Sequence, residues 1–190
     1  SSPAGRSATF TLPNGHAIYG GFRGPPGDEG VNNATTRPPD PDPATANPAT
    51  DSILSGDLNG DDSPNFTNYG DNVYHVVTAS GTNASAILSG LTIRGGNGSA
   101  GAADESGGGI YVLAGSPNID SCTFAENSSN SNGGAGYLAN GSGPSFTNCL
   151  VTNNRALTGT GGGFNCTGTN SPLFTDCTFS NNTSNGSGGG

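Results

Sequence analysis

Three segments of the chain repeat one another and decide the fold: residues 107–127 read GGGIYVLAGSPNIDSCTFAEN, residues 133–154 read GGAGYLANGSGPSFTNCLVTNN, and residues 161–182 read GGGFNCTGTNSPLFTDCTFSNN. Glycine-rich triplets open successive units at positions 107, 133, 161 and 188, at spacings of 26, 28 and 27 residues. A proline (117, 144, 172) and a cysteine (122, 149, 177) recur at spacings of 27 and 28. Three independent markers in one register indicate one structural unit per period.

Each unit predicts three short strands separated by turns. Alternation places Ile110 and Val112 on one face of the first strand, and a single apolar residue centres the second and third strands, as Ile119 and Phe124 do. Residues that favour or tolerate bends follow the second strand at Gly90, Ser121, Asn148 and Asp176, and the third at Gly96, Asn127, Asn154 and Asn182. A unit of about 27 residues is then one rung of a coil whose rungs hydrogen-bond in parallel.

The composition supports a repeat fold over a flexible stalk. Gly, Asn, Ser and Thr make up 99 of the 190 residues, and hydrophobic residues only 30%. Disordered chains share that bias but lack the β-branched and aromatic residues that recur here in short runs. We therefore predict one all-β domain over residues 1–190, a parallel β-helix (β-solenoid) of roughly five to six rungs with a thin core replicated rung by rung.

The charge excludes two classes of partner. Five basic residues, all Arg, stand against 14 acidic ones, giving a net charge of −9. Nucleic acids and anionic membrane surfaces both call for basic clusters, so neither is expected as a partner. No apolar run approaches the roughly 18–20 residues of a membrane span, so we expect no membrane insertion.

The three repeats, together with LPNGHAIYGGF (12–22), SILSGDLNGDD (52–62) and YHVVTASGTNASAILSGLTIRGGN (74–97), resemble the right-handed parallel β-helix proteins of the pectate-lyase-like superfold. They are most similar to repeats of bacterial secreted and polymorphic-outer-membrane-type surface proteins. The resemblance covers nearly the whole chain except about residues 24–50. It implies a right-handed coil and a secreted or cell-surface bacterial product. It leaves function open, since the superfold hosts lyases, hydrolases, adhesins and structural rods.

Residues 24–50 hold 7 of the 13 prolines. Consecutive prolines cannot join a central sheet, so this segment is predicted to be an inserted loop or arm. It is either a solvated excursion from one turn or an arm that reaches a neighbouring subunit.

One short segment is a candidate calcium loop. Asp57, Asn59 and Asp61 offer oxygen ligands at alternate positions, followed by Asp62. The segment departs from the EF-hand pattern, because Asp62 stands where Gly belongs and Asn68 stands where a bidentate carboxylate is needed. A bound Ca²⁺ and a plain Asn/Asp/Gly turn both remain open; no other cofactor is expected.

The cysteines fit no zinc spacing, because no CxxC pair occurs. Cys122, Cys149 and Cys177 are predicted to stack on adjacent rungs as a structural ladder, either as buried thiols or with one disulfide among them. Cys166 takes the place of Val112 in its unit and is expected to fill the core.

Two further surface features are ambiguous. Tyr111 and Tyr137 share an outward position on consecutive rungs, where they could stack on a sugar ring or simply on each other. Asn-x-Ser/Thr sequons make glycosylation of an extracellular rod a prediction, although this composition produces many by chance; they begin at Asn33, Asn65, Asn83, Asn97, Asn127, Asn140, Asn165, Asn181, Asn182 and Asn185.

No catalytic residues are predicted. After Gly107 the acids are Asp120, Glu126 and Asp176, at different positions of their units, so the repeats supply no paired carboxylates for hydrolysis or elimination. The first hypothesis is a non-catalytic extracellular structural or adhesive β-solenoid that self-associates end to end into a filament. The alternative is a carbohydrate-binding or carbohydrate-cleaving β-helix, a lyase or hydrolase.

Overall fold

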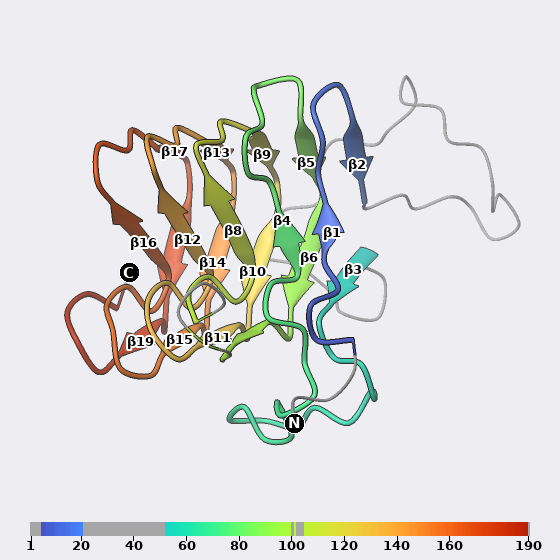
Figure 1. Ribbon diagram of the computed structural model, residues 1–190, viewed down its shortest axis with the longest axis vertical. Coiled ribbons are helices and arrows are strands. Elements are labelled where there is room, and N and C mark those ends of the chain that lie inside the picture. Colours follow the sequence, from blue (N-terminus) through green and yellow to red (C-terminus); the bar gives the residue numbers. More distant parts are fainter. Residues whose placement is uncertain (1–4, 21–51, 100, 102–104, 190) are drawn as a thin grey trace, which may run out of the picture.

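The computed structural model describes residues 5–20, 52–99, 101 and 105–189, and in that part of the chain every named element is a β-strand. The strands wind into a solenoid whose rungs lie side by side, so that strands distant in the sequence become neighbours (Figure 1). All named strand pairs are parallel. The predicted fold class, a parallel β-solenoid, is confirmed. Among the described residues, no helix is long and apolar enough to cross a membrane.

Four sheets run along the solenoid. The first contains β1 (Phe10–Thr11), β4 (Val77–Thr78), β8 (Ile110–Leu113), β12 (Gly136–Ala139) and β16 (Phe164–Thr167). The second contains β2 (Ala17–Tyr19), β5 (Ile87–Ser89), β9 (Asn118–Asp120), β13 (Ser145–Thr147) and β17 (Leu173–Thr175). The third contains β3 (Ser52–Ser55), β6 (Leu91–Arg94), β10 (Thr123–Ala125), β14 (Leu150–Thr152) and β18 (Thr178–Ser180). The fourth contains β7 (Asn97–Gly98), β11 (Ser128–Ser129), β15 (Arg155–Ala156) and β19 (Thr183–Ser184).

The fourth sheet was not expected, because the sequence predicted three strands per unit. Its strands are two residues long and carry mostly polar side chains, so they show no apolar alternation. Three of the sheets contain five strands each, as five rungs require. About three turns of about 28 residues are regular. The turn that contains β4 is lengthened before β8, and residues 21–51, between β2 and β3, include the predicted arm at 24–50 and lie outside the described residues.

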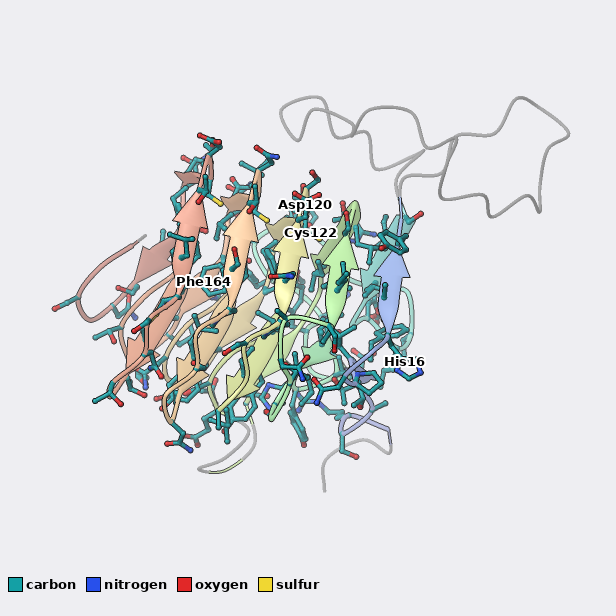
Figure 2. All side chains as sticks on the ribbon, turned by 90° about the horizontal axis from the view of Figure 1, so that it is seen from above. His16, Asp120, Cys122 and Phe164 are labelled. Atoms are coloured by element: carbon teal, nitrogen blue, oxygen red, sulfur yellow. The ribbon has the colours of Figure 1, made fainter. Side chains whose placement is uncertain are left out.

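The core is a set of columns running through the rungs. Paired positions carry Leu88, Ile119, Phe146 and Phe174 in the second sheet and Ile93, Phe124, Val151 and Phe179 in the third. Phe164 lies inside the coil (Figure 2), and its ring packs at 4.7 Å from that of Phe146. Gly136 stands below Phe164 in the first sheet, where a Cβ would collide with that ring. Each rung therefore contributes only a few apolar side chains, in agreement with the low hydrophobic content.

The first set of bends forms as expected. Gly90, Ser121, Asn148 and Asp176 all have left-handed backbone conformations, with φ between 51° and 67°. The second set is shifted by one residue. The left-handed residues are Gly95, Glu126, Asn153 and Asn181, each directly before the position that the sequence indicated. The expectation for Gly96, Asn127, Asn154 and Asn182 was therefore wrong.

Those four positions instead form a buried ladder. Oδ1 of Asn127 accepts the N–H of Gly96 at 3.0 Å, Oδ1 of Asn154 accepts the N–H of Asn127 at 3.0 Å, and Oδ1 of Asn182 accepts the N–H of Asn154 at 3.1 Å. Each Asn also donates from Nδ2 to a carbonyl of the preceding rung, as Asn154 does to Phe124 at 2.9 Å. These side chains satisfy backbone groups that the bend removes from the strand ladder.

Candidate functional site

The predicted calcium loop is closed by its own first residue. Oδ1 of Asp57 accepts the backbone N–H of Gly60 at 2.7 Å and of Asp61 at 3.3 Å, and Oδ2 accepts that of Asp62 at 3.1 Å. Burial opposes ionisation of Asp57, but the backbone hydrogen bonds outweigh it, so the pKa of this carboxyl is lowered. Asp57 is thus an ionised carboxylate at the centre of a tight turn.

The carboxylates that come together are not the predicted set. Oxygen atoms of Asp57, Asp61 and Asp71 lie within 4.8 Å of one another. Asp71 lies outside the predicted segment, and Asn59 contacts it through a backbone N–H to Oδ2 at 3.0 Å. Three carboxylates at this separation suit a hard divalent cation such as Ca²⁺, which takes oxygen ligands. Asp71 follows Asp57 by 14 residues and so lies beyond a 12-residue calcium loop of the EF-hand type.

Asp62 faces elsewhere. Its Oδ2 accepts Nδ2 of Asn72 at 2.8 Å, and the same Nδ2 donates to the carbonyl of Gly95 at 2.7 Å. Burial, followed by the charges of the neighbouring aspartates, raises the pKa of Asp62 to about 6 despite that hydrogen bond. Asn72 is fully buried, so this pair anchors the loop to the bend that follows β6.

The loop forms one wall of a groove on the side of the solenoid, which we call the lateral groove. Its volume is about 820 Å³. The wall is lined by Asp57, Gly60, Asp62, Ser63, Pro64, Asn65, Phe66 and Tyr69. The floor is lined by Ser55, Arg94, Gly95, Glu126, Asn153, Asn154, Arg155, Asn181 and Thr183, which lie where the chain leaves the third sheet for the fourth. The groove therefore crosses successive rungs.

Tyr69 fixes the wall to the floor. Its hydroxyl donates to the carbonyl of Glu126 at 2.9 Å, and its own carbonyl accepts Nδ2 of Asn97 at 2.6 Å. Burial, with the charges of Asp62 and Glu126, raises the pKa of Tyr69, so the phenol stays protonated and remains a donor. The ring edge of Tyr69 meets Phe66 at a centroid separation of 5.2 Å.

Arg155 is held in place on the groove floor by an aromatic ring and a hydrogen bond. Its guanidinium lies 4.1 Å from the centroid of the Phe66 ring, and Nη2 donates to Ser128 at 3.4 Å. Nε is buried and has no hydrogen-bond partner in the described part of the chain. Burial lowers the pKa of Arg155, although the group remains charged. Arg155 was not among the predicted site residues, although it stands at a position that is Ser128 or Thr183 on the neighbouring rungs.

The tyrosine pair belongs to a longer aromatic stack. His75 and Tyr111 stack at 4.5 Å, and Tyr111 and Tyr137 stack at 5.7 Å, with interplanar angles of 21° and 20°. Both faces of the Tyr111 ring are covered by its neighbours. Sugar stacking, which needs a free ring face, is therefore restricted to Tyr137.

The four cysteines are free thiols. Cys122 and Cys149 are buried on adjacent rungs and Cys177 is half-buried on the next, with Cys122 near Asp120 at one end of β9 (Figure 2). Burial raises the pKa of Cys149. Cys166 is exposed, contrary to the expectation that it fills the core. It does pair with Leu138 in register, but no further described rung covers it.

Sequon asparagines fall into two groups. Asn127 is completely buried in the ladder, and the side chain of Asn97 is bonded to Tyr69. Asn83 and Asn185 are exposed. Glycosylation stays a prediction, and only for exposed positions.

Comparison with known proteins identifies the fold family. No curated protein and no solved structure matches the chain significantly. The family model described as a right-handed β-helix region matches residues 65–188, well over half of the chain. That match begins at the loop that forms the groove wall and extends through the regular turns. The chain belongs to the right-handed β-helix family.

Proposed function

We propose that this protein is a non-catalytic β-solenoid, secreted or exposed on a bacterial surface, with a structural or adhesive role. The observation that carries the proposal is the continuity of its columns: apolar side chains, thiols and ladder asparagines repeat on successive rungs. Such stacking makes a stiff rod from a polar sequence, because each rung satisfies the backbone of the next. Detection of the protein in the culture medium or on intact cells tests the location, and recovery only from the cytosol would refute it.

End-to-end association is part of the proposal. Inward positions that are fully buried in the middle of the stack become accessible at its ends, and Phe179 is 37% exposed where its partner Val151 is 0%. At the other end Ile18 and Leu54 are only partly buried against the core. Apolar side chains at both ends of the described stack suit a head-to-tail contact between copies of this chain, which need not close and so produces filaments.

Electron microscopy and sedimentation over a range of concentrations test the filament. We expect fibres that Phe179→Asp abolishes. Leu173→Asp is the matched control, because Leu173 is 59% exposed but pairs with Ser145 on the outer face of the second sheet. Monodisperse particles at all concentrations would refute end-to-end stacking, and equal loss of fibres in both variants would refute the assigned contact.

A carbohydrate-cleaving enzyme is the second candidate, and the observation that favours it is Asp62. A carboxyl with a pKa of about 6 beside a groove is suited to general acid catalysis near neutral pH. Incubation with neutral and acidic polysaccharides, with and without calcium, should release reducing ends or unsaturated products if this candidate is right. Activity that Asp62→Asn removes would support it, and no product from any substrate would exclude it.

A further inference from the structure

The lateral groove concentrates the available positive charge of the described chain. Arg6 is only 7% exposed; it donates to the carbonyl of Asn72 at 2.6 Å and to Ser99 at 2.6 Å. The other two described arginines, Arg94 and Arg155, both line the groove. Neither forms an ion pair with a carboxylate of the described residues. The protein has a net charge of −9, so two guanidinium groups without an ion pair in one groove are unusual and can attract an anionic ligand.

Arg155 in particular has no opposite charge beside it among the described residues. It is half-buried, it stacks on Phe66, and its only hydrogen bond is the long one from Nη2 to Ser128. A desolvated charge is costly unless an opposite charge accompanies it. The planar guanidinium matches a carboxylate, which accepts two parallel N–H bonds. The geometry therefore calls for an anionic group beside Arg155.

The rest of the floor offers hydrogen bonds at a regular spacing. Asn153 and Asn181 occupy equivalent bends on adjacent rungs, both are exposed, and neither side-chain amide is bonded to a described residue. Rungs repeat at about 4.8 Å, so an extended ligand that crosses these two rungs meets two side-chain amides, while the preceding rungs carry Glu126 and Gly95 at the same position. Amide groups pair well with the N–H and C=O groups of a peptide backbone.

Two other ligand classes fit less well. A sugar ring usually needs an exposed aromatic face, but one face of Phe66 is covered by Arg155, and Tyr69 is only 8% exposed. A densely charged polyanion would meet Asp57, Asp62 and Glu126, which also line the groove. A peptide with isolated carboxylates and neutral backbone amides needs no exposed aromatic face and is repelled less by the acidic lining residues.

We propose that the lateral groove binds an extended acidic peptide segment of a partner protein. Arg155 and Arg94 receive side-chain carboxylates of the peptide, and Asn153 and Asn181 hydrogen-bond its backbone. The site lies on the side of the solenoid, and its two arginines belong to inner rungs, away from the end face that Phe179 occupies. It gives the adhesive role a chemically defined partner.

Fluorescence anisotropy with a labelled Ser-rich peptide that carries two well-separated Asp residues tests the site. We expect saturable binding, at least tenfold weaker binding by Arg155→Gln or Arg94→Gln, and loss of binding by the double variant, as buried charge contacts commonly show effects of about this size. Arg155→Lys should fall between, because it keeps the charge but not the planar fork. Circular dichroism checks that each variant folds.

The controls separate recognition from bulk charge. Thr175→Asp changes the net charge by the same amount as each Arg→Gln variant but lies on the second sheet, so it should leave binding within about twofold. A matching peptide of Asn and Ser should not bind. Equal weakening by Thr175→Asp, no binding of the acidic peptide, or tighter binding of an oligouronate through the same arginines would each overturn the proposal.

Discussion

Removal of Asn154 tests whether the buried ladder holds the rungs together. Asn154 is 1% exposed and lies at the centre of the ladder. Its Oδ1 accepts both the backbone N–H and Nδ2 of Asn127 at 3.0 Å. Its Nδ2 donates to the carbonyl of Phe124 at 2.9 Å, to that of Thr152 at 3.0 Å and to Oδ1 of Asn182 at 2.9 Å.

The magnitude follows from the groups that Asn154→Ala strands. The N–H of Asn127 loses its acceptor in a fully buried bend, and the carbonyl of Phe124 loses a donor. Each buried group left without a partner costs about 1–3 kcal/mol. We expect the free energy of unfolding to fall by about 3–5 kcal/mol, which is large against a typical total of about 5–15 kcal/mol.

Urea denaturation followed by far-UV circular dichroism measures the change. Asn153→Gly is the matched control, because Asn153 is exposed, has no side-chain hydrogen bond to a described residue and has φ of 55°, which Gly adopts without strain. The control should change stability by no more than about 1 kcal/mol. A loss below about 1 kcal/mol for Asn154→Ala, or one equal to the control, would refute a structural role for the ladder.

Four further predictions use the same structure. Gly136→Ala should lower stability by about 1–3 kcal/mol in urea denaturation because the added Cβ meets Phe164, whereas Gly143→Ala, which makes only ordinary contacts, should not; equal effects would contradict the packing argument. The pKa of Asp62, about 6, lies above its unfolded value near 3.8, so in EDTA the free energy of unfolding should decrease as pH rises through this interval, and Asp62→Asn should remove that slope; an unchanged pH profile would rule out the effect. If the carboxylates of Asp57, Asp61 and Asp71 hold calcium, Ca²⁺ at a hundredfold excess over Kd should stabilise the fold by about 2.7 kcal/mol and raise the melting temperature accordingly. Asp71→Ala should abolish this rise and Asp176→Ala should retain it. An absence of any calcium effect on the parent chain eliminates the site. A thiol reagent should modify Cys166 in the folded protein and reach Cys122 and Cys149 only on unfolding, and equal rates for all three would show that the core columns are open.

The periodic residues allowed the fold to be predicted because a solenoid makes its contacts between equivalent positions. The markers 27 or 28 residues apart, such as Cys122 and Cys149, fix which residues become neighbours without any knowledge of long-range topology. The predicted strands therefore pair in the expected register, as Phe124 does with Val151. The fourth sheet could not be predicted in this way, because two polar residues per strand leave no hydrophobic period.

The site was much less predictable. Arg94 and Arg155 are 61 positions apart in the sequence. Phe66 lies in a loop outside the regular turns. The coil places Arg94 and Arg155 on the floor of one groove, and the docking of that loop through Tyr69 and Asn72 adds Phe66. Asp71 joins Asp57 and Asp61 for the same reason. One feature of the sequence does point to Arg155: it stands between Ser128 and Thr183 in a column of otherwise uncharged residues.

By itself, the sequence determined the coil, its period, the inward columns and the first set of bends, because each depends on residues that recur at one spacing. Tertiary structure alone decided which asparagines turn inward, where the left-handed residue of the second bend falls, and which charges share the lateral groove. The physical reason is that a shift of one residue at a bend decides which of two neighbouring side chains faces solvent and which is buried in the ladder. Neighbouring asparagines such as Asn153 and Asn154 are identical in sequence terms, and only their hydrogen-bond partners on adjacent rungs separate them.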